Sequence, residues 1–404
     1  MIETKFKDTE VGRIPEDWEV VKLSEKGELL RGSLNPQLYP TKQFVEYSMP
    51  SFDNGKIPET KDGITMQSSR TCIKAPVLLY NKLNVRQRRI WFVELCAQNS
   101  ICSMEFLPYV SKHIDLCCLK YFVDTDKVTS DFIGMSRGTS NSQKRIAPSD
   151  FLEYKIGLPK DIAEQSRIAS ALSSIDNLIS ALDKLIEKKK NIKQGTMQQL
   201  LTGKKRLKGF SEPWEEKTLQ SLGYFDGKAV TPYLTPNDIF YEYSMLAFDE
   251  YHQPCTSKGS DMLSARVAIS DEVLLINKLN VRKKRIWHIK RCEENAVCSG
   301  EFLPYKSSVI DLSLLSYILL TDKVVQDFID MSTGTSNSQR RVRPKNILDY
   351  KVNIPMDKKE QKAIASVLSS MDNEISALES KKAKYNSMKQ GMMQQLLTGK
   401  IRLI

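Results

Sequence analysis

The chain has 404 residues, of which 41% are hydrophobic and 27% charged, a composition typical of a folded globular protein with two or three domains. Sixty basic residues outnumber 49 acidic ones, and the net charge of +11 favours a polyanionic partner such as nucleic acid, although an ordinary basic protein can have the same balance. The sequence contains neither 18 consecutive apolar residues nor an apolar N-terminal segment, which argues against a membrane span or a signal peptide and predicts a cytoplasmic protein.

The cysteines and histidines are too dispersed to suggest a metal site. None of the eight cysteines forms a Cys-x-x-Cys pair, and the three histidines, His113, His252 and His288, lie far apart in the sequence. We therefore expect no bound metal, and we expect the cysteines to be buried free thiols.

The second half of the chain repeats the first without gaps. Asn81 recurs as Asn277, a shift of 196 residues, and Trp18 and Trp214 obey the same shift. The matching segments are 81–86 and 277–282, 105–109 and 301–305, 138–143 and 334–339, and 198–204 and 394–400. Such a match predicts a duplicated unit whose copies are each large enough to have a core of their own.

The first part of each copy, roughly 13–158 and 209–354, has the pattern of a mixed α/β globular domain. Short β-rich runs predict strands, for example at 77–80 and 273–276. Apolar periodicity predicts helices, with the clearest candidates at 116–132 and 312–328.

The second part of each copy predicts one long helix. Asp161 and Asp357 are placed to cap its start, and Gly203 and Gly399 to stop it. Apolar residues follow a 4–3–4–3 spacing, which is typical of a seam buried against another helix. The predicted seam residues are Ile168, Leu172, Ile175, Ile179, Leu182 and Ile186 in the first copy, and Ile364, Leu368, Met371, Ile375 and Leu378 in the second.

Two similar helices in one chain most simply pair with each other. An antiparallel pair would give the chain a pseudo-two-fold axis and place the globular parts at opposite ends. The rise over residues 168–200 is about 50 Å at 1.5 Å per residue, or about fifteen base pairs of DNA. The chain could then hold two DNA-reading domains apart along a duplex; the alternative is that the helices form an interface with another chain.

Two loops in each copy have side chains suited to DNA. The basic loop, residues 82–89 and 278–285, combines Lys, Arg, Asn and Gln, which bind base edges and phosphates. The polar loop, residues 138–145 and 334–341, offers hydroxyls, amides and backbone N–H groups and ends in positive charge. A solvated basic hairpin and a tight capping turn are the alternative interpretations.

These loops supply the candidate DNA-binding residues. They are Lys82, Asn84, Arg86, Arg88, Arg89, Thr139, Ser140, Asn141, Gln143, Lys144 and Arg145 in the first copy, and Lys278, Asn280, Arg282, Lys284, Arg285, Thr335, Ser336, Asn337, Gln339, Arg340 and Arg341 in the second.

Recognisable catalytic motifs are missing from the sequence. Thr202-Gly203-Lys204 lacks the upstream glycine of a phosphate-binding loop, and neither G-x-G-x-x-G, H-E-x-x-H nor the methyltransferase tetrapeptide [DN]-P-P-[YFW] occurs. The sequence therefore predicts a non-catalytic chain without a cofactor of its own.

Over almost its full length the chain resembles the specificity (S) subunits of type I restriction–modification systems. The resemblance rests on motifs that occur in this order, once in each copy. They are 12–18 and 211–214 at the start, 164–169 and 360–365 at the helix openings, and 197–203 and 393–399 at the helix exits.

The resemblance implies two similar α/β target-recognition domains separated by two long helices that pair as an antiparallel coiled coil with pseudo-two-fold symmetry. The implied segments are target-recognition domain 1 (1–160), helical spacer 1 (161–206), target-recognition domain 2 (207–356) and helical spacer 2 (357–404). The implied partners are double-stranded DNA, two methyltransferase subunits and the restriction (translocase and nuclease) subunits. The alternatives are the specificity chain of a system with a fused nuclease and methyltransferase, and a non-catalytic helical scaffold.

The similarity of the two copies predicts an interrupted, nearly palindromic DNA target. Domains that differ little should contact similar bases, and a two-fold axis would present those contacts in opposite directions. Departures from symmetry should come from the differing loop positions Gln87/Lys283, Arg88/Lys284, Arg137/Thr333 and Ala147/Arg343. The copies are less similar before residue 77, where further base contacts could lie.

Overall fold

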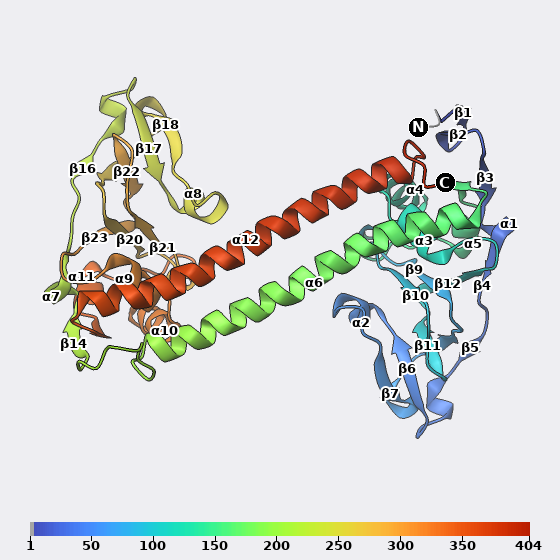
Figure 1. Cartoon of the computed structure of the whole chain (residues 1–404), viewed down its shortest axis with the longest axis horizontal. Coiled ribbons are helices and arrows are strands. Elements are labelled where there is room, and N and C mark those ends of the chain that lie inside the picture. The colour runs from blue at the N-terminus through green and yellow to red at the C-terminus, as the bar shows by residue number, and fades with distance from the viewer. Residues whose placement is uncertain (1–3) are drawn as a thin grey trace. The chain divides into compact units, whose positions relative to one another are not determined.

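The structure is a computed structural model that describes residues 4–404 (Figure 1). The chain divides into two compact units: unit 1 contains residues 4–183 and 381–404, and unit 2 contains residues 184–380. Each unit holds one copy of the globular part together with one segment of each long helix. The predicted α+β architecture is confirmed.

The globular part of unit 1 contains a proximal sheet and a distal sheet. The proximal sheet is antiparallel, in the order β10 (Ile90–Val93), β9 (Val77–Asn81), β12 (Phe106–Ser111) and β4 (Gly27–Leu29). The distal sheet has the order β5 (Ser33–Leu34), β8 (Arg70–Cys72), β11 (Ser100–Ser103), β6 (Gln43–Tyr47) and β7 (Glu59–Asp62), with one parallel pair, β11 and β6. Two further pairs are β1 (Phe6–Thr9) with β2 (Gly12–Pro15), and β3 (Trp18–Lys22) with β13 (Lys155–Pro159).

Short helices cover these sheets. They are α1 (Leu23–Lys26), α2 (Met49–Asp53), α3 (Leu116–Val123), α4 (Asp126–Met135) and α5 (Pro148–Leu152), with the 3-10 turns η1 (Pro36–Leu38), η2 (Gly63–Thr65) and η3 (Val85–Gln87). The proximal core packs Trp18, Tyr80, Tyr109 and Phe132 with residues of both long helices. We call the distal sheet with α2, η1 and η2 the distal lobe; Phe44 and Met66 belong to a small core of its own.

Unit 2 repeats this architecture. Its proximal sheet is β15 (Tyr224–Phe225), β23 (Phe302–Lys306), β20 (Val273–Asn277) and β21 (Ile286–Ile289), and its distal sheet is β16 (Ala229–Val230), β19 (Arg266–Ala268), β22 (Ala296–Ser299), β17 (Ile239–Tyr243) and β18 (Cys255–Lys258). The remaining elements are the pair β14 (Glu215–Thr218) and β24 (Lys351–Ile354), the helices α7 (Leu219–Leu222), α8 (Met245–Glu250), α9 (Leu312–Leu319), α10 (Asp322–Met331) and α11 (Pro344–Leu348), and the turns η4 (Pro232–Leu234), η5 (Gly259–Asp261) and η6 (Val281–Lys283). The predicted strands at 77–80 and 273–276 are confirmed as parts of β9 and β20.

The predicted single helix at 116–132 is wrong: the chain forms two helices, α3 and α4. The break falls at Asp124 and Thr125, because Thr125 adopts an extended conformation and its hydroxyl caps α4 by accepting a hydrogen bond from the Val128 N–H. The second copy breaks at the equivalent position, between α9 and α10.

The two long helices are α6 (Ile162–Leu200) and α12 (Lys358–Leu396). Asp161 and Asp357 cap them as predicted, since each carboxylate accepts a hydrogen bond from the N–H two residues later, at 2.9 and 2.8 Å. Gly203 and Gly399 follow the helix ends with φ of 69° and 68°, the left-handed conformation that favours glycine. Among residues 4–404, no helix is long and apolar enough to cross a membrane.

In unit 1 the start of α6 lies beside the end of α12, so the two helices run antiparallel. Ile168 and Leu172 of α6 share the proximal core with Leu396 and Leu397. Asp176 of α6 forms an ion pair of 2.7 Å with Lys389 of α12 and accepts a hydrogen bond of 2.7 Å from Tyr121 of α3. Burial of Asp176 opposes its ionisation, but the hydrogen bonds from Lys389 and Tyr121 outweigh burial and lower its pKa.

In unit 2 the start of α12 lies beside the end of α6. Leu200 shares a core with Ile364 and Leu368, and Asp372 forms a 2.5 Å ion pair with Lys193 and accepts a 2.7 Å hydrogen bond from Tyr317. The predicted antiparallel pairing within one chain is therefore confirmed in both units, and most predicted seam residues are buried. The half-buried exceptions are Ile179, Met371 and Leu378.

An arginine that follows each long helix binds a glutamate near the start of the other helix. In unit 1 Arg402 forms two hydrogen bonds to Glu164, at 2.6 and 2.7 Å, and two to Asp17, at 2.8 and 2.6 Å. In unit 2 Arg206 forms the equivalent pair with Glu360, at 2.6 and 2.7 Å. Both glutamates are buried, so each arginine neutralises a carboxylate that water cannot reach.

The cysteines only partly follow the prediction. All eight are free thiols, as expected, but only Cys102, Cys118 and Cys298 are buried. Cys72, on β8 next to the edge strand of the distal sheet, is exposed.

Candidate nucleic-acid interface

The basic loop connects β9 to β10 through a tightly folded turn. Asn84 and Arg88 flank η3 in the left-handed conformation, with φ of 50° and 46°. The Asn81 side chain accepts a hydrogen bond of 2.9 Å from the Leu83 N–H, and Val85 is buried beneath the turn. Buried anchors of this kind hold the polar side chains of the loop in place at the surface.

The polar loop turns at a glycine that no other residue could replace without strain. Gly138 has a φ of 149°, and a Cβ there would lie 2.9 Å from the Gln143 carbonyl oxygen and from the Lys144 Cα. Gly334 has the same geometry, with a φ of 152°. The residues of the loop from Thr139 to Gln143 are exposed.

The structure brings the basic loop and the polar loop together into one surface. The Asn84 N–H donates to the Lys144 carbonyl at 2.8 Å, and the Ile146 N–H donates to the Lys82 carbonyl at 3.1 Å. Unit 2 repeats both bonds, at 2.9 Å between Asn280 and Arg340 and 3.0 Å between Val342 and Lys278. The two predicted sites of each copy are thus one candidate site.

Several of the predicted cations already have carboxylate partners inside the protein. Arg89 is bound by Asp53 through two hydrogen bonds of 2.8 and 2.7 Å, and its hydrogen bonding lowers the pKa of Asp53. Arg145 is held in the same way by Glu105, at 2.9 to 3.2 Å. The corresponding pairs of unit 2 are Arg285 with Asp249 and Arg341 with Glu301.

Arg88 and Lys284 occupy equivalent positions at the end of the basic loop. Arg88 pairs with Asp126 at the start of α4, and Lys284 pairs with Asp322 of α10 at 2.7 Å. In unit 2 Arg340 also donates to the Ser332 carbonyl at 2.6 Å. These cations support the loops, and their charge is partly neutralised before any ligand arrives.

The remaining predicted residues have polar groups that face solvent. Arg86 and Arg282 are exposed and form no ion pair within residues 4–404. Around them lie the half-buried Lys82, Asn84 and Lys144 with the exposed Thr139, Ser140, Asn141 and Gln143, and in unit 2 Lys278, Asn280, Thr335, Ser336, Asn337 and Gln339. At this surface each unit therefore presents an exposed guanidinium without an ion pair, with amides and hydroxyls nearby, a combination suited to base edges and phosphates.

The carboxylates that orient these loops were not predicted from the sequence. Asp53 and Asp249 precede the basic loops by about 30 residues, and Glu105 and Glu301 precede the polar loops by a similar distance. Their signal was retention in both copies, because Asp53 and Glu105 recur as Asp249 and Glu301 at the shift of 196 residues.

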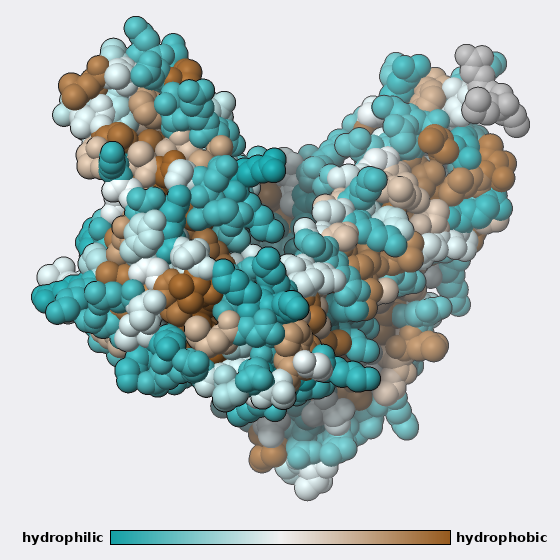
Figure 2. Space-filling view, turned by 60° about the vertical axis from the view of Figure 1, so that its left-hand side comes forward, coloured by the Kyte–Doolittle hydropathy of each residue, from teal (hydrophilic) through white to brown (hydrophobic). Residues whose placement is uncertain are grey.

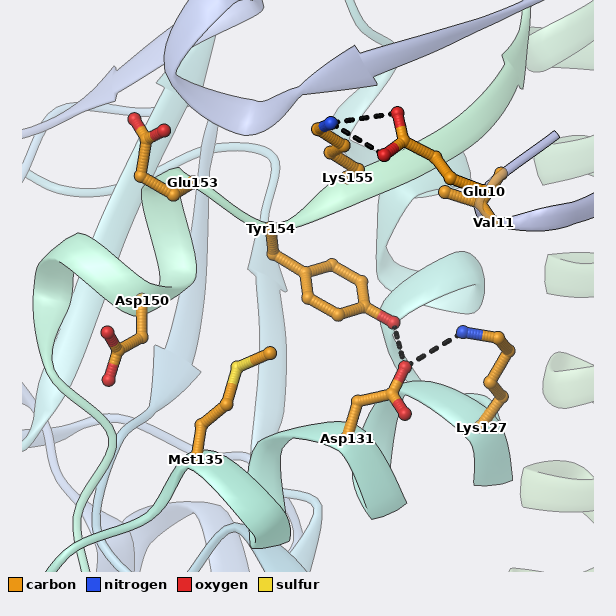
Figure 3. Close-up of a pocket in the computed structure, with 9 residues that line it drawn as sticks. All are labelled: Glu10, Val11, Lys127, Asp131, Met135, Asp150, Glu153, Tyr154 and Lys155. Carbon is orange, nitrogen blue, oxygen red and sulfur yellow. Dashed lines mark hydrogen bonds and ion pairs between the residues drawn. The ribbon is translucent and has the colours of Figure 1, made fainter.

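A separate hollow in unit 1 lies between α4, α5 and the β1–β2 hairpin (Figure 3). Four of its charged side chains form two pairs: Lys155 contacts Glu10 at 2.7 Å, and Lys127 donates at 2.9 Å to Asp131, which also accepts from Tyr154 at 2.6 Å. Its lining includes no serine, cysteine or histidine. Over residues 4–404, no cluster of three or more His, Cys, Asp or Glu side chains could hold a metal ion.

Comparison with known proteins identifies relatives of the whole chain. No protein-family model matches it. The type I restriction enzyme MjaVIII specificity subunit of Methanocaldococcus jannaschii is 27% identical over 432 residues, which cover 99% of this chain and 97% of that protein. The chain is homologous, over nearly its full length, to type I restriction enzyme specificity subunits.

Solved structures show the same fold for this homologue of specificity subunits. The S subunit of a type I restriction–modification system from M. genitalium matches 98% of this chain and 99% of its own length, with a TM-score of 0.62 and 13% identity. A chain from a study of complex assembly and conformational transition in the type I system covers 96% of this chain and 99% of its own length, with a TM-score of 0.57 and 15% identity. The predicted resemblance and fold are therefore confirmed.

Proposed function

We propose that this chain is the DNA-binding specificity subunit of a type I restriction–modification enzyme. The observation that carries the proposal is the presence, in both copies, of a basic loop and a polar loop joined into one surface with a free arginine, Arg86 or Arg282. In this proposal each copy binds one half of an interrupted, nearly palindromic target, because the two surfaces are nearly identical. The paired helices act as the spacer between the half-sites.

In the same proposal the chain needs no cofactor and performs no catalysis. The outer faces of α6 and α12 bind two methyltransferase subunits, which supply the S-adenosylmethionine chemistry, and restriction subunits complete the enzyme. The chain would act in the cytoplasm, where its DNA target lies. The domain boundaries at residues 160, 206 and 356 belong to this proposal.

The decisive experiment is methylome sequencing of cells that carry this chain with its methyltransferase. We expect one methylated, interrupted motif whose half-sites are close to inverted repeats, and we expect that deleting the chain abolishes it. The purified chain alone should transfer no methyl group from S-adenosylmethionine to DNA. Half-sites that are not inverted repeats of each other would contradict the near-palindromic target. A motif that is still methylated after deletion of the chain would contradict the proposed function itself.

The alternative of a fused nuclease and methyltransferase differs only in the partner, which affinity purification of the chain from its host identifies. The alternative of a helical scaffold predicts no sequence-specific binding. Competition of the chain–methyltransferase complex between its motif and shuffled DNA distinguishes the scaffold from a specificity subunit.

Replacement of the free arginines should weaken DNA binding. Arg86→Ala and Arg282→Ala should each cost about 1–3 kcal/mol of binding free energy if the side chain contacts a base edge, and should relax one position of the motif. A phosphate contact would instead reduce by about one the slope of the logarithm of the binding constant against the logarithm of the salt concentration, and the motif would not change. Both are measured by titration of the chain–methyltransferase complex with DNA at several salt concentrations.

Arg291→Ala is the matched control, because Arg291 is an exposed arginine outside both loops, and its counterpart in the first copy is Leu95. Unchanged affinity for both loop variants, at a salt concentration where the control also binds normally, would remove the basic loops from the interface. Arg89→Ala is a poor test of DNA contact, since it also releases Asp53 from its ion pair.

A further inference from the structure

The distal lobe of unit 1 ends in an apex where η1 and η2 meet; we define the first apex as residues 37–42 and 64–67. Gly63 donates to the Lys42 carbonyl at 2.9 Å, and Ile64 donates to the Pro40 carbonyl at 3.2 Å. A Cβ on Gly63 would lie 2.2 Å from the Tyr39 carbonyl oxygen, so the close approach of the two turns requires glycine.

Unit 2 has the same backbone at its second apex, residues 233–238 and 260–263. Gly259 donates to the Asp238 carbonyl at 2.9 Å, and Ser260 donates to the Pro236 carbonyl at 3.1 Å. A Cβ on Gly259 would again lie 2.2 Å from a carbonyl oxygen, that of Thr235. The two copies therefore hold different side chains on one shared scaffold.

Each apex exposes large apolar side chains. Leu38 and Leu234 occupy equivalent positions, and each is 72% exposed. Tyr39 and Ile64 accompany the first leucine, and Tyr233 and Leu263 the second, all exposed. Figure 2 shows brown, hydrophobic side chains on the distal lobe of unit 2, at the upper left. A single exposed leucine needs no explanation, but a largely exposed leucine retained at the same position in both copies, next to other exposed apolar side chains, favours a ligand at this surface.

The exposed residues around that leucine differ between the copies at almost every position. The differing pairs are Gln37/Tyr233, Tyr39/Thr235, Thr41/Asn237, Lys42/Asp238, Ile64/Ser260, Thr65/Asp261 and Gln67/Leu263. The residues that build the scaffold, Pro36, Pro40 and Gly63, are identical in the second copy. The basic and polar loops, by contrast, are nearly the same in both copies.

We propose that the two apexes contact DNA bases and carry the difference between the two half-sites. The inference rests on the proposed function, in which each copy binds one half-site through a basic and a polar loop that are nearly the same in both copies. Any difference between the half-sites then has to be read by side chains that differ between the copies. A surface with a retained scaffold and substituted side chains is what two different base sequences require.

The side chains at the apexes can form hydrogen bonds and apolar contacts with DNA bases. Lys42 offers a donor for guanine O6 and N7, whereas Asp238 accepts from the cytosine amino group. Leu38 and Leu234 supply the shared apolar contact, which inserts between base steps and is the same for both half-sites. Residues 224–272 contain eight acidic residues against three lysines and arginines, so phosphate attraction is not what would bring this lobe to DNA.

The test transplants the second apex onto the first. The variant carries all seven differing residues, at exposed positions of the shared backbone: Gln37→Tyr, Tyr39→Thr, Thr41→Asn, Lys42→Asp, Ile64→Ser, Thr65→Asp and Gln67→Leu. In cells with the methyltransferase, we expect the methylated motif to change in one half-site only, toward the sequence of the other. At the altered base pairs the preference should shift by about tenfold or more, the discrimination that one base pair usually carries.

Leu38→Ala and Leu234→Ala should lower methylation without changing the motif, whereas Leu95→Ala, at a leucine that is 85% exposed but not retained in the second copy, should have no effect. An unchanged motif in a transplant that methylates normally overturns the proposal. So does an unchanged motif with weaker co-purification of the methyltransferase, which would make the apex a protein-docking surface.

A transplant that methylates nothing is resolved by the single exposed substitution Lys42→Asp. A changed half-site in that variant supports the proposal, and an unchanged one overturns it. Absence of any chain-dependent motif with the unmodified protein is a separate result, since it contradicts the proposed function rather than the role of the apexes.

Discussion

Leu172→Asp should destabilise unit 1 by about 4 kcal/mol or more. Leu172 has no exposed surface and lies in the core that α6, α12 and the globular part share. Loss of a buried leucine side chain costs about 2–5 kcal/mol, and the unpaired carboxylate adds the cost of its own burial. Urea unfolding, followed by the circular dichroism of the helices and by tryptophan fluorescence, measures the loss.

Leu178→Asp is the matched control, because it makes the same substitution on the same helix at a leucine that is 49% exposed. Its effect should lie within about 0.5 kcal/mol of zero. Equal stability of the two variants would mean that α6 does not bury this face in solution, and would contradict the antiparallel pair.

Arg402→Ala should cost about 3–5 kcal/mol, because it leaves a buried carboxylate without its partner. The side chain of Arg402 is 10% exposed and that of Glu164 only 4%. Hydrogen bonding to Arg402 also lowers the pKa of Asp17. The Asp17 part of this stabilisation should therefore be present above the ordinary pKa of an aspartate and lost as the pH falls below it.

The double variant Arg402→Ala/Glu164→Gln distinguishes the ion pair from lost packing. Removing the buried charge should recover part of the stability, so the double variant should unfold at a higher urea concentration than Arg402→Ala alone. Lys155→Ala, which breaks an exposed ion pair with Glu10, should change stability little. If the double variant were less stable than the single one, unpaired charge would not explain the loss.

Much of the architecture could be predicted because its signals are local and periodic. The heptad spacing of Leu172 and Leu368, the capping Asp161 and the helix-ending Gly203 act within one or two helical turns, so the residue types alone indicate the structure. The repeat at a shift of 196 residues also predicted that the two copies form the same secondary and tertiary structure. Even so, the chain interrupts a predicted helix at Thr125, and at the equivalent Thr321, where the backbone is extended before the next helix starts.

The candidate interface was predicted only as two separate loops. Residue types marked both loops, but the hydrogen bond from Asn84 to Lys144 spans 60 residues, and no periodicity encodes such a contact. Judged by residue type alone, Arg86 and Arg89 are equally good candidates for a DNA contact. The tertiary structure distinguishes the two arginines, because it places Asp53 beside Arg89 and leaves Arg86 facing solvent.

The sequence by itself thus determined the duplication, the type of most elements, the capped helices and the apolar seam, since each depends on residues close together in the chain. The tertiary structure alone decided which arginines are free, how Arg402 meets Glu164, and where the two turns of each distal lobe form an apex. These features depend on contacts between distant segments, and their geometry follows from packing, which residue order does not display.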